Sequence, residues 1–179
     1  MINTFVSADH HFGHANVLRL CNRPFDTVEQ MDLVFIELWN SVIGQNDLVY
    51  YLGDFTLNNE AFARSIFRQL NGMIHILANP WHHDKRWLKK GLYYTASQEI
   101  VVYAPPIQVV TVEKVKVTFC HYPLAEWEAS YHMGVHLHAH CHGNLPRIAN
   151  RLDVGVDVHN YYPILFEDAV KLAQEEIVK

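Results

Sequence analysis

The chain has 179 residues, half of which are hydrophobic, and it carries a formal net charge of −5 at pH 7. This length suits one domain with a sizeable core, whereas the apolar runs are far shorter than the ~20 residues that a membrane helix needs. The acidic balance argues against an extended nucleic-acid surface, and the N-terminal segment lacks the charged stretch and long apolar run of a signal peptide.

The first half of the chain alternates predicted strands with predicted helices. The clearest helix spans residues 27–41, because Thr27 can cap its first turn and Gln30 stands three residues later, as in a capping box. Alternation of this kind is typical of a parallel α/β layer. The predicted elements are strands over residues 2–8, 47–54 and 73–77, and helices over residues 27–41, 59–70 and around 84–90.

The second half is predicted to be rich in strands. Three segments alternate or run apolar and are separated by a proline pair and by a charged turn, so we expect antiparallel strands. The closing segment has the pattern of an amphipathic helix, and the two halves together predict a single α/β domain. The segments are residues 98–103, 107–112 and 115–120 for the strands, 166–179 for the helix and 1–179 for the domain.

The chain contains three cysteines, Cys21, Cys120 and Cys141. Their odd number, their wide spacing and the lack of a C-x-x-C pair argue against a disulfide framework. We therefore expect reduced thiols and a cytoplasmic location.

Polar side chains follow the predicted strands at the points where they end. In open α/β sheets, ligands bind at the carboxyl ends of the strands. Each residue has an ordinary alternative, such as a turn for Asp9 or a hydrogen-bonded core position for His121, but the joint pattern favours a metal site. The residues are Asp9-His10-His11, Gly53-Asp54, Asn79 and His121.

The segment HLHAHCHG, residues 136–143, places a histidine at every second position. In an extended strand these imidazoles would share one face, and gathered imidazoles indicate a metal because neutral histidine is the commonest metal ligand. At a rise of roughly 3.3 Å per residue the outer two would lie about 20 Å apart, so only a neighbouring pair can serve one small site. Mixed carboxylate, imidazole and amide ligands favour Mn, Fe, Zn or Ni.

Taken in order, these motifs resemble those of calcineurin-like metallophosphoesterases. The resemblance runs from residue 5 to about 160, and segments such as HFGHANVLRLCNRPF and LDVGVDVHNYYPI are similar to the small phage and bacterial branch. It implies a β-sandwich flanked by helices that hydrolyses a phosphodiester or phosphomonoester, nucleotides included, with a metal-activated water. The motifs are D-x-H at Asp9 and His11, G-D at Gly53 and Asp54, then Asn79, His121, and H-x-H-G at His140, His142 and Gly143.

The resemblance also implies a site with two divalent ions, with Mn first and Fe, Zn, Ni or Co as alternatives. Asp54 would bridge the ions and take part in catalysis, while His136 and His138 would support the site or the fold. His14 and Arg23 are candidates for phosphate binding, and the alternatives are a structural role for His14 and a surface salt bridge for Arg23. The implied ligands are Asp9, His11 and His142 for one ion and Asn79, His121 and His140 for the other.

Two departures from the family pattern bear on catalysis. Where the family usually has G-N-H-[DE], this chain has Ala78-Asn79-Pro80 and then Trp81-His82-His83-Asp84. We expect His82 or His83 to replace the missing catalytic histidine, with His83 favoured because Asp84 could orient its ring. The alternative is that both histidines flank the next helix and that the chain is a metal-binding scaffold with little hydrolysis, acting through a protein partner. The second departure, Ala139 in place of a frequent glycine, is mild.

Overall fold

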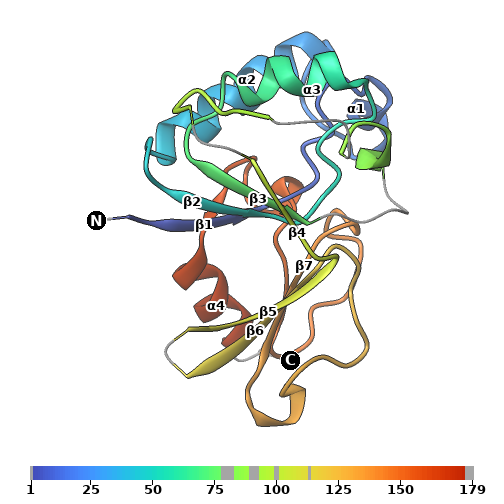
Figure 1. The fold of residues 1–179 in the computed structure, drawn as a ribbon. Helices are drawn as coiled ribbons and strands as arrows, with labels where there is room; N and C mark the ends of the chain where they lie inside the picture. Colours follow the sequence, from blue (N-terminus) through green and yellow to red (C-terminus); the bar gives the residue numbers. More distant parts are fainter. Residues whose placement is uncertain (1, 78–82, 89–92, 99–100, 113, 176–179) are drawn as a thin grey trace.

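Two β-sheets form the centre of the molecule (Figure 1). The structure is a computed structural model, and it describes residues 2–77, 83–88, 93–98, 101–112 and 114–175. The first sheet has the strand order β4-β3-β2-β1-β9 and the second has the order β5-β6-β7-β8. The bounds are β1 Thr4–Ser7, β2 Leu48–Tyr51, β3 Met73–Leu77, β4 Val102–Ala104, β5 Ile107–Val112, β6 Val115–Cys120, β7 Val135–His138, β8 Arg151–Asp153 and β9 Ile164–Leu165.

The first sheet is mostly parallel. Strands β1 to β4 run in one direction, and β9 pairs antiparallel with β1. In the second sheet β5 and β6 form an antiparallel pair, while β7 and β8 add in parallel. The protein is therefore an α/β protein with two mixed sheets, as the sequence predicts in outline.

Helices cover the outer face of the first sheet. Alternate residues of its strands point to opposite faces, and Phe5, Val49 and Ile74 pack on this side against helices α2 and α3. The buried residues of α2 are Met31, Phe35 and Trp39, spaced four apart so that they share one helix face. The helices are α1 Asn16–Leu20, α2 Val28–Val42, α3 Glu60–Phe67 and α4 Phe166–Gln174, with short 3₁₀ helices η1 His83–Arg86, η2 Ser130–His132 and η3 Val156–Val158.

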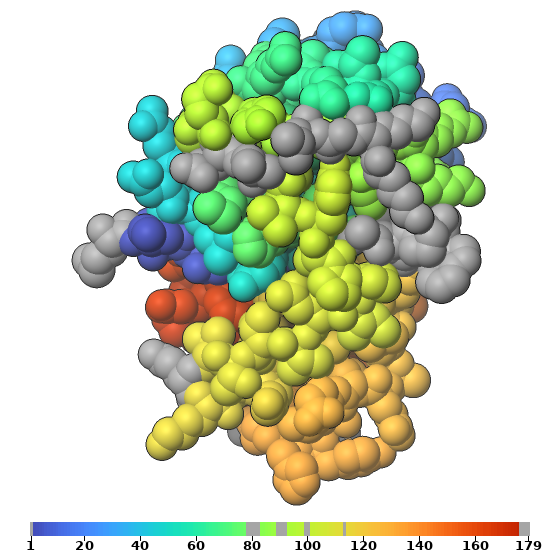
Figure 2. Space-filling view, in the orientation of Figure 1, coloured from blue at the N-terminus to red at the C-terminus, as the bar shows by residue number. Residues whose placement is uncertain are grey.

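The two sheets face each other across a second core. Val6 from β1 and Leu77 from β3 belong to the same buried cluster as Val117 and Phe119 from β6. The ring of Tyr50 stacks on that of Phe119 with centroids 4.7 Å apart, and α4 adds further buried side chains to the cluster. In the space-filling view, α3 lies at the top of the molecule and β5 crosses the middle of the front face (Figure 2).

Local signals placed several elements correctly. The hydroxyl of Thr27 accepts a hydrogen bond from the Gln30 amide at 3.2 Å, which confirms the predicted cap of α2. The side chain of Gln30 accepts from the Asp26 amide at 2.9 Å, so the capping box closes one residue earlier than the standard motif. The antiparallel pairing predicted for the strands at 107–112 and 115–120 is also confirmed.

Two predictions about elements need correction, and one helix was not predicted. The strand predicted over 98–103 is β4, which pairs parallel with β3 in the first sheet rather than antiparallel with β5. The chain changes sheets at Pro105-Pro106, since proline has no amide hydrogen for a ladder. The helix predicted around 84–90 is the short η1, and α1 was missed because it has only five residues and no side-chain cap.

Within the described residues, no helix is both long and apolar enough to cross a membrane. The three cysteines are free thiols, as predicted.

Candidate metal centre

The polar residues predicted at strand ends gather at one edge of the two sheets. Backbone hydrogen bonds join their loops: the amides of Asp9 and His11 donate to the carbonyl oxygens of Gly53 and Asp54 at 3.1 and 3.0 Å. The side chain of Asp9 then reaches the second sheet's loop, where its Oδ2 accepts from the His140 amide at 2.8 Å. The residues are Asp9 and His11 after β1, Asp54 after β2, His121 after β6, and His140 and His142 after β7.

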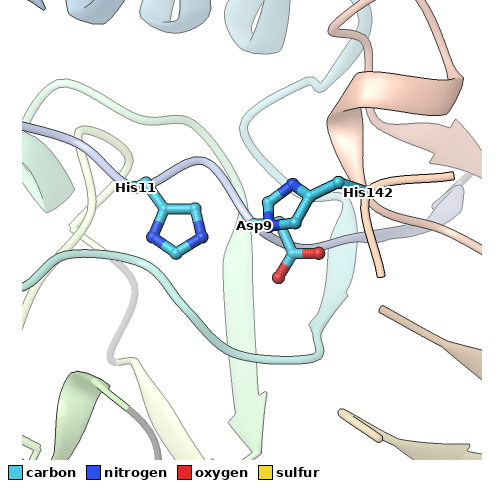
Figure 3. Close-up of side chains that lie close together, drawn as sticks. All are labelled: Asp9, His11 and His142. Carbon is cyan, nitrogen blue, oxygen red and sulfur yellow. The ribbon is translucent and has the colours of Figure 1, made fainter. Parts of the chain in front are cut away.

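The side chains form two compact clusters. Asp9, His11 and His142 each offer a ligand atom within 4.8 Å of the others. Asp9 and His11 come from the loop after β1, and they face His142 from the loop after β7 (Figure 3). Asp54, His121 and His140 form the second cluster by the same measure. The structure thus groups the described candidates in the two sets that the family resemblance implies.

Asp54 lies between the two clusters. Its Oδ2 is 3.6 Å from Nε2 of His11 in one cluster and 3.5 Å from Nε2 of His121 in the other. A single carboxylate oxygen therefore faces imidazoles of both clusters, which is the position that a bridging ligand requires.

The backbone is strained at this edge. Five of the six residues adopt a positive φ, which non-glycine residues rarely do: 61° at Asp9, 53° at His11, 56° at Asp54, 72° at His140 and 48° at His142. Strained conformations cluster at functional sites because the surrounding structure must maintain them at a cost of about 1–3 kcal/mol each. The backbone conformation of these loops therefore directs the side chains toward a common site.

Burial and a hydrogen bond shift the pKa values of two residues in the first cluster. Burial raises the pKa of Asp9 to about 7, against the opposing effect of His121 and His142. Burial alone would lower the pKa of His142, but the hydrogen bond to Asp157 raises it to about 10. A metal ion at this cluster would therefore displace protons from both groups.

The second cluster is electrostatically different. Burial would raise the pKa of Asp54, but the hydrogen bond and positive charge of His121 hold it well below its usual range. Burial lowers the pKa of His140, so its imidazole is neutral near pH 7 and free to donate a lone pair.

The residues fit divalent ions. Oδ1 of Asp9 and Nδ1 of His11 are buried and have no hydrogen-bond partner within the described ranges. Buried polar atoms are rarely left unpaired, because desolvation without a partner costs about 1–3 kcal/mol. A metal ion would satisfy such atoms, and the carboxylate and imidazole donors suit Mn, Fe, Zn, Ni or Co.

The histidine run divides into two pairs. Strand β7 ends at His138, so the expectation that four imidazoles line one face is wrong beyond that residue. The left-handed turn at 140 and 142 ends the alternation and directs His140 and His142 to different clusters. His136 is structural: its Nδ1 donates to the Thr118 carbonyl oxygen at 3.0 Å, and its Nε2 accepts from the Leu124 amide at 3.0 Å.

His83 lies at the rim of the site. Its Nε2 is 4.0 Å from Oδ2 of Asp54, and its side chain is 48% exposed. Asp84 is buried, and its carboxylate accepts from the amides of Phe55 and Thr56 at 3.0–3.1 Å. These contacts fix the loop that follows Asp54. The predicted ligand Asn79 and the second acid candidate His82 lie outside the described residues.

Arg23 does not line the site from the solvent side. It is only 4% exposed, and its N–H groups donate to Asp157, to the carbonyl oxygens of Asp9 and His10, and toward Met31. The phosphate-binding role predicted for Arg23 therefore needs correction, because its guanidinium is turned inward to protein acceptors. His14 lies closer, with its ring centroid 5.7 Å from that of His11.

Asp157 was missed by the sequence analysis. Its Oδ2 lies 2.6 Å from Nδ1 of His142. It belongs to the segment LDVGVDVHNYYPI, which carries part of the family resemblance, but neither aspartate of that segment stands in a pattern that assigns it a partner.

Relatives of this chain are found in archaea and phages. The chain is 30% identical over 184 residues to the uncharacterized protein MJ1445 of Methanocaldococcus jannaschii, a match that covers 98% of the chain and 93% of that protein. The chain belongs to the MJ1445 family. The Gene 66 protein of Mycobacterium phage L5 is 31% identical over 90 residues, which are 50% of this chain and 37% of that protein.

The fold of this MJ1445 family member also occurs in a bacterial protein. The crystal structure of the protein of unknown function AQ665 from Aquifex aeolicus superimposes with a TM-score of 0.67 at 20% identity, covering 96% of this chain and 100% of that chain. No model of a known protein family matches the chain. The names of these relatives state no activity, so the geometry of the two clusters is what bears on function.

Proposed function

We propose that the chain is a dinuclear metal-dependent phosphoesterase with a metallophosphoesterase-type β-sandwich. The observation that carries the proposal is the position of Asp54, whose Oδ2 lies within 3.6 Å of imidazole nitrogens from both clusters. Two ligand sets that share one carboxylate are typical of two-metal hydrolytic sites. Two facing sheets, with α2 and α3 on the outer face of the first, agree with the proposed fold.

The residues would divide the work as follows. Asp9, His11 and His142 would hold one ion, and His121 and His140, with Asn79, would hold the other, while Asp54 would serve both. When bound, two divalent ions would neutralise phosphate charge and lower the pKa of a water toward neutrality. The acidic net charge of the chain does not prevent phosphate binding, because two dications reverse the local sign.

The chain's own contribution is positioning and proton transfer. The strained loops fix the ligands before substrate arrives, so that little reorganisation is needed during the reaction. His83, half exposed beside Asp54, is proposed to donate a proton to the leaving oxygen of a phosphoester, and its exposure and its nearness to Asp54 support this role. His14, next to His11, is proposed to contact the phosphate from the same side.

Hydrolysis of bis-p-nitrophenyl phosphate by Mn²⁺-loaded protein tests this function. We expect turnover that disappears on chelation, returns with Mn²⁺ and is absent in Asp54→Asn. The matched control is Asp168→Asn, because Asp168 is an exposed carboxylate on α4. A wild-type protein that binds metal but does not hydrolyse phosphodiesters or phosphomonoesters would contradict the proposal and favour a metal-binding scaffold.

A cytoplasmic location remains part of the proposal.

A further inference from the structure

Behind the first cluster, Arg23 and Asp157 form a buried ion pair. Nε of Arg23 donates to Oδ1 of Asp157 at 2.7 Å, and Nη2 donates to Oδ2 at 2.8 Å. The side-chain exposure is 0% for Arg23 and 8% for Asp157. Two parallel hydrogen bonds between a guanidinium and a carboxylate fix both groups in one plane, which a lysine cannot do.

Arg23 also holds the loop that carries two of the candidate ligands. Its Nη2 donates to the carbonyl oxygen of Asp9 at 2.6 Å, and its Nη1 donates to that of His10 at 2.7 Å. Asp9 and His11, on either side of this contact, both have the positive φ described above. A strained loop persists only where its surroundings determine it, and Arg23 supplies such a contact from inside the protein.

Asp157 orients the third ligand of the same cluster. Because a carboxylate only accepts hydrogen bonds, the 2.6 Å contact requires Nδ1 of His142 to carry the hydrogen. Once a metal ion displaces the other proton of the ring, Nε2 offers its lone pair to the ion. Carboxylates that orient a metal-bound histidine in this way typically change metal affinity 10–100-fold when they are lost.

We propose that Arg23 and Asp157 are positioning residues that assemble the Asp9–His11–His142 cluster from two distant parts of the chain. The inference rests on the proposed dinuclear centre, and it adds that the pair supports only one of the two ions. Loss of the pair lowers the affinity for the ion held by Asp9, His11 and His142. It leaves unchanged the affinity for the ion held by Asp54, His121 and His140.

The alternative to a hydrogen-bonded support is a further metal site, because Cys21, His142 and Asp157 also offer ligand atoms within 4.8 Å of one another. Two ligands of one tetrahedral zinc ion, each about 2.0–2.1 Å from it, lie roughly 3.3 Å apart. The 2.6 Å separation of His142 and Asp157 is instead that of a hydrogen bond. The geometry favours a support for His142 over a third ion.

Manganese binding by Arg23→Lys and Asp157→Asn tests the proposal. We expect wild-type protein to bind two Mn²⁺ per chain, and each variant to bind one with unchanged affinity and the other 10–100-fold more weakly. Arg64→Lys is the matched control, because Arg64 also contacts a carboxylate through two nitrogens, at 3.0 and 2.7 Å from Oε1 of Glu60, but on the surface of α3. It should bind both ions as the wild type does.

Combining variants shows which ion is affected. His140→Ala disrupts the second cluster and keeps the first intact. Adding Arg23→Lys to this variant should weaken the binding of the ion at the first cluster 10–100-fold. In His142→Ala, which keeps the second cluster intact, adding Arg23→Lys should change nothing. Cys21→Ser should keep both ions in the otherwise wild-type chain, whereas loss of one ion would make the thiolate a ligand and overturn the proposal.

Thermal unfolding separates positioning from a general loss of stability. Each variant is melted with chelator and with Mn²⁺, and the gain in Tm on adding Mn²⁺ is compared with that of the wild type. A positioning role reduces this gain. A lower Tm in chelator with a wild-type gain, or equal weakening of both ions, would overturn the proposal, while a wild-type protein that binds fewer than two ions would instead overturn the proposed function.

Discussion

Replacing Asp9 by Asn should stabilise the metal-free protein at high pH. Asp9 is fully buried, and burial raises its pKa from 3.8 to about 7. Its Oδ2 accepts from the His140 amide, a bond that an asparagine oxygen can also accept. The substitution therefore removes the ionisable group while keeping the shape and that contact.

The magnitude follows from the difference between the folded and unfolded pKa. Between about pH 4 and pH 7 the unfolded chain loses a proton from Asp9 that the folded state keeps, so the unfolded state becomes more favourable and the stability of the fold decreases as pH rises through this range. A shift of about three units corresponds to ~4 kcal/mol above pH 7. Of this, roughly 2 kcal/mol develops between pH 5.5 and pH 8. Asparagine does not ionise and lacks this loss.

Urea unfolding in chelator at pH 5.5 and pH 8 measures the effect. The stability of Asp9→Asn minus that of the wild type should increase by roughly 2 kcal/mol between these pH values. The side-chain amide of the introduced asparagine has an unpaired N–H, which costs about 1–3 kcal/mol. This cost is the same at both pH values, so it does not change the difference between them. With Mn²⁺ the order should reverse, because only the wild type gains stability from an ion at the first cluster. Parallel pH profiles for the two proteins in chelator would refute the reasoning.

Three further predictions, made with four substitutions, test the site. Asp54→Asn should lower the Mn²⁺ content below two ions per chain, measured by elemental analysis, and should abolish hydrolysis; full metal content with normal turnover would exclude a bridging role. His83→Ala, made beside His82→Ala, should keep both ions but slow hydrolysis of alkyl phosphoesters by 10²–10⁴-fold, with a smaller loss for p-nitrophenyl esters, whose leaving group needs little protonation. Equal, normal rates for both variants on alkyl esters would show that neither residue is the acid. Cys141→Ser should keep turnover within a few-fold and retain both ions, because Cys141 belongs to neither cluster of the described residues; a loss of bound ion would identify a thiolate ligand.

The parts of the fold that were predicted correctly depend on local signals. Helix α2 has a capping residue and a buried stripe, both visible in the sequence, and the hairpin of β5 and β6 has alternating residues around a tight turn. Strand β4 could not be placed in this way, because its partner β3 is set by tertiary contacts rather than by neighbouring sequence. The short helix α1 has no side-chain cap from which its start could be predicted.

The same distinction applies to the site. Residues at strand ends could be proposed because parallel strands bring their ends to one edge, and the structure does bring Asp9, His11 and His142 together. Periodicity failed at His140, where a positive φ ends the strand pattern. The contact between Arg23 and Asp157 spans 134 residues, and neither residue stands in a pattern that predicts the other.

The number of Mn²⁺ ions bound by the wild-type chain tests the central claim most directly. Folded protein is stripped with chelator, equilibrated with excess Mn²⁺, freed of unbound metal and analysed for manganese and protein together. We expect two ions per chain, because two clusters of donors share Asp54. One ion or fewer in folded protein would contradict the dinuclear centre.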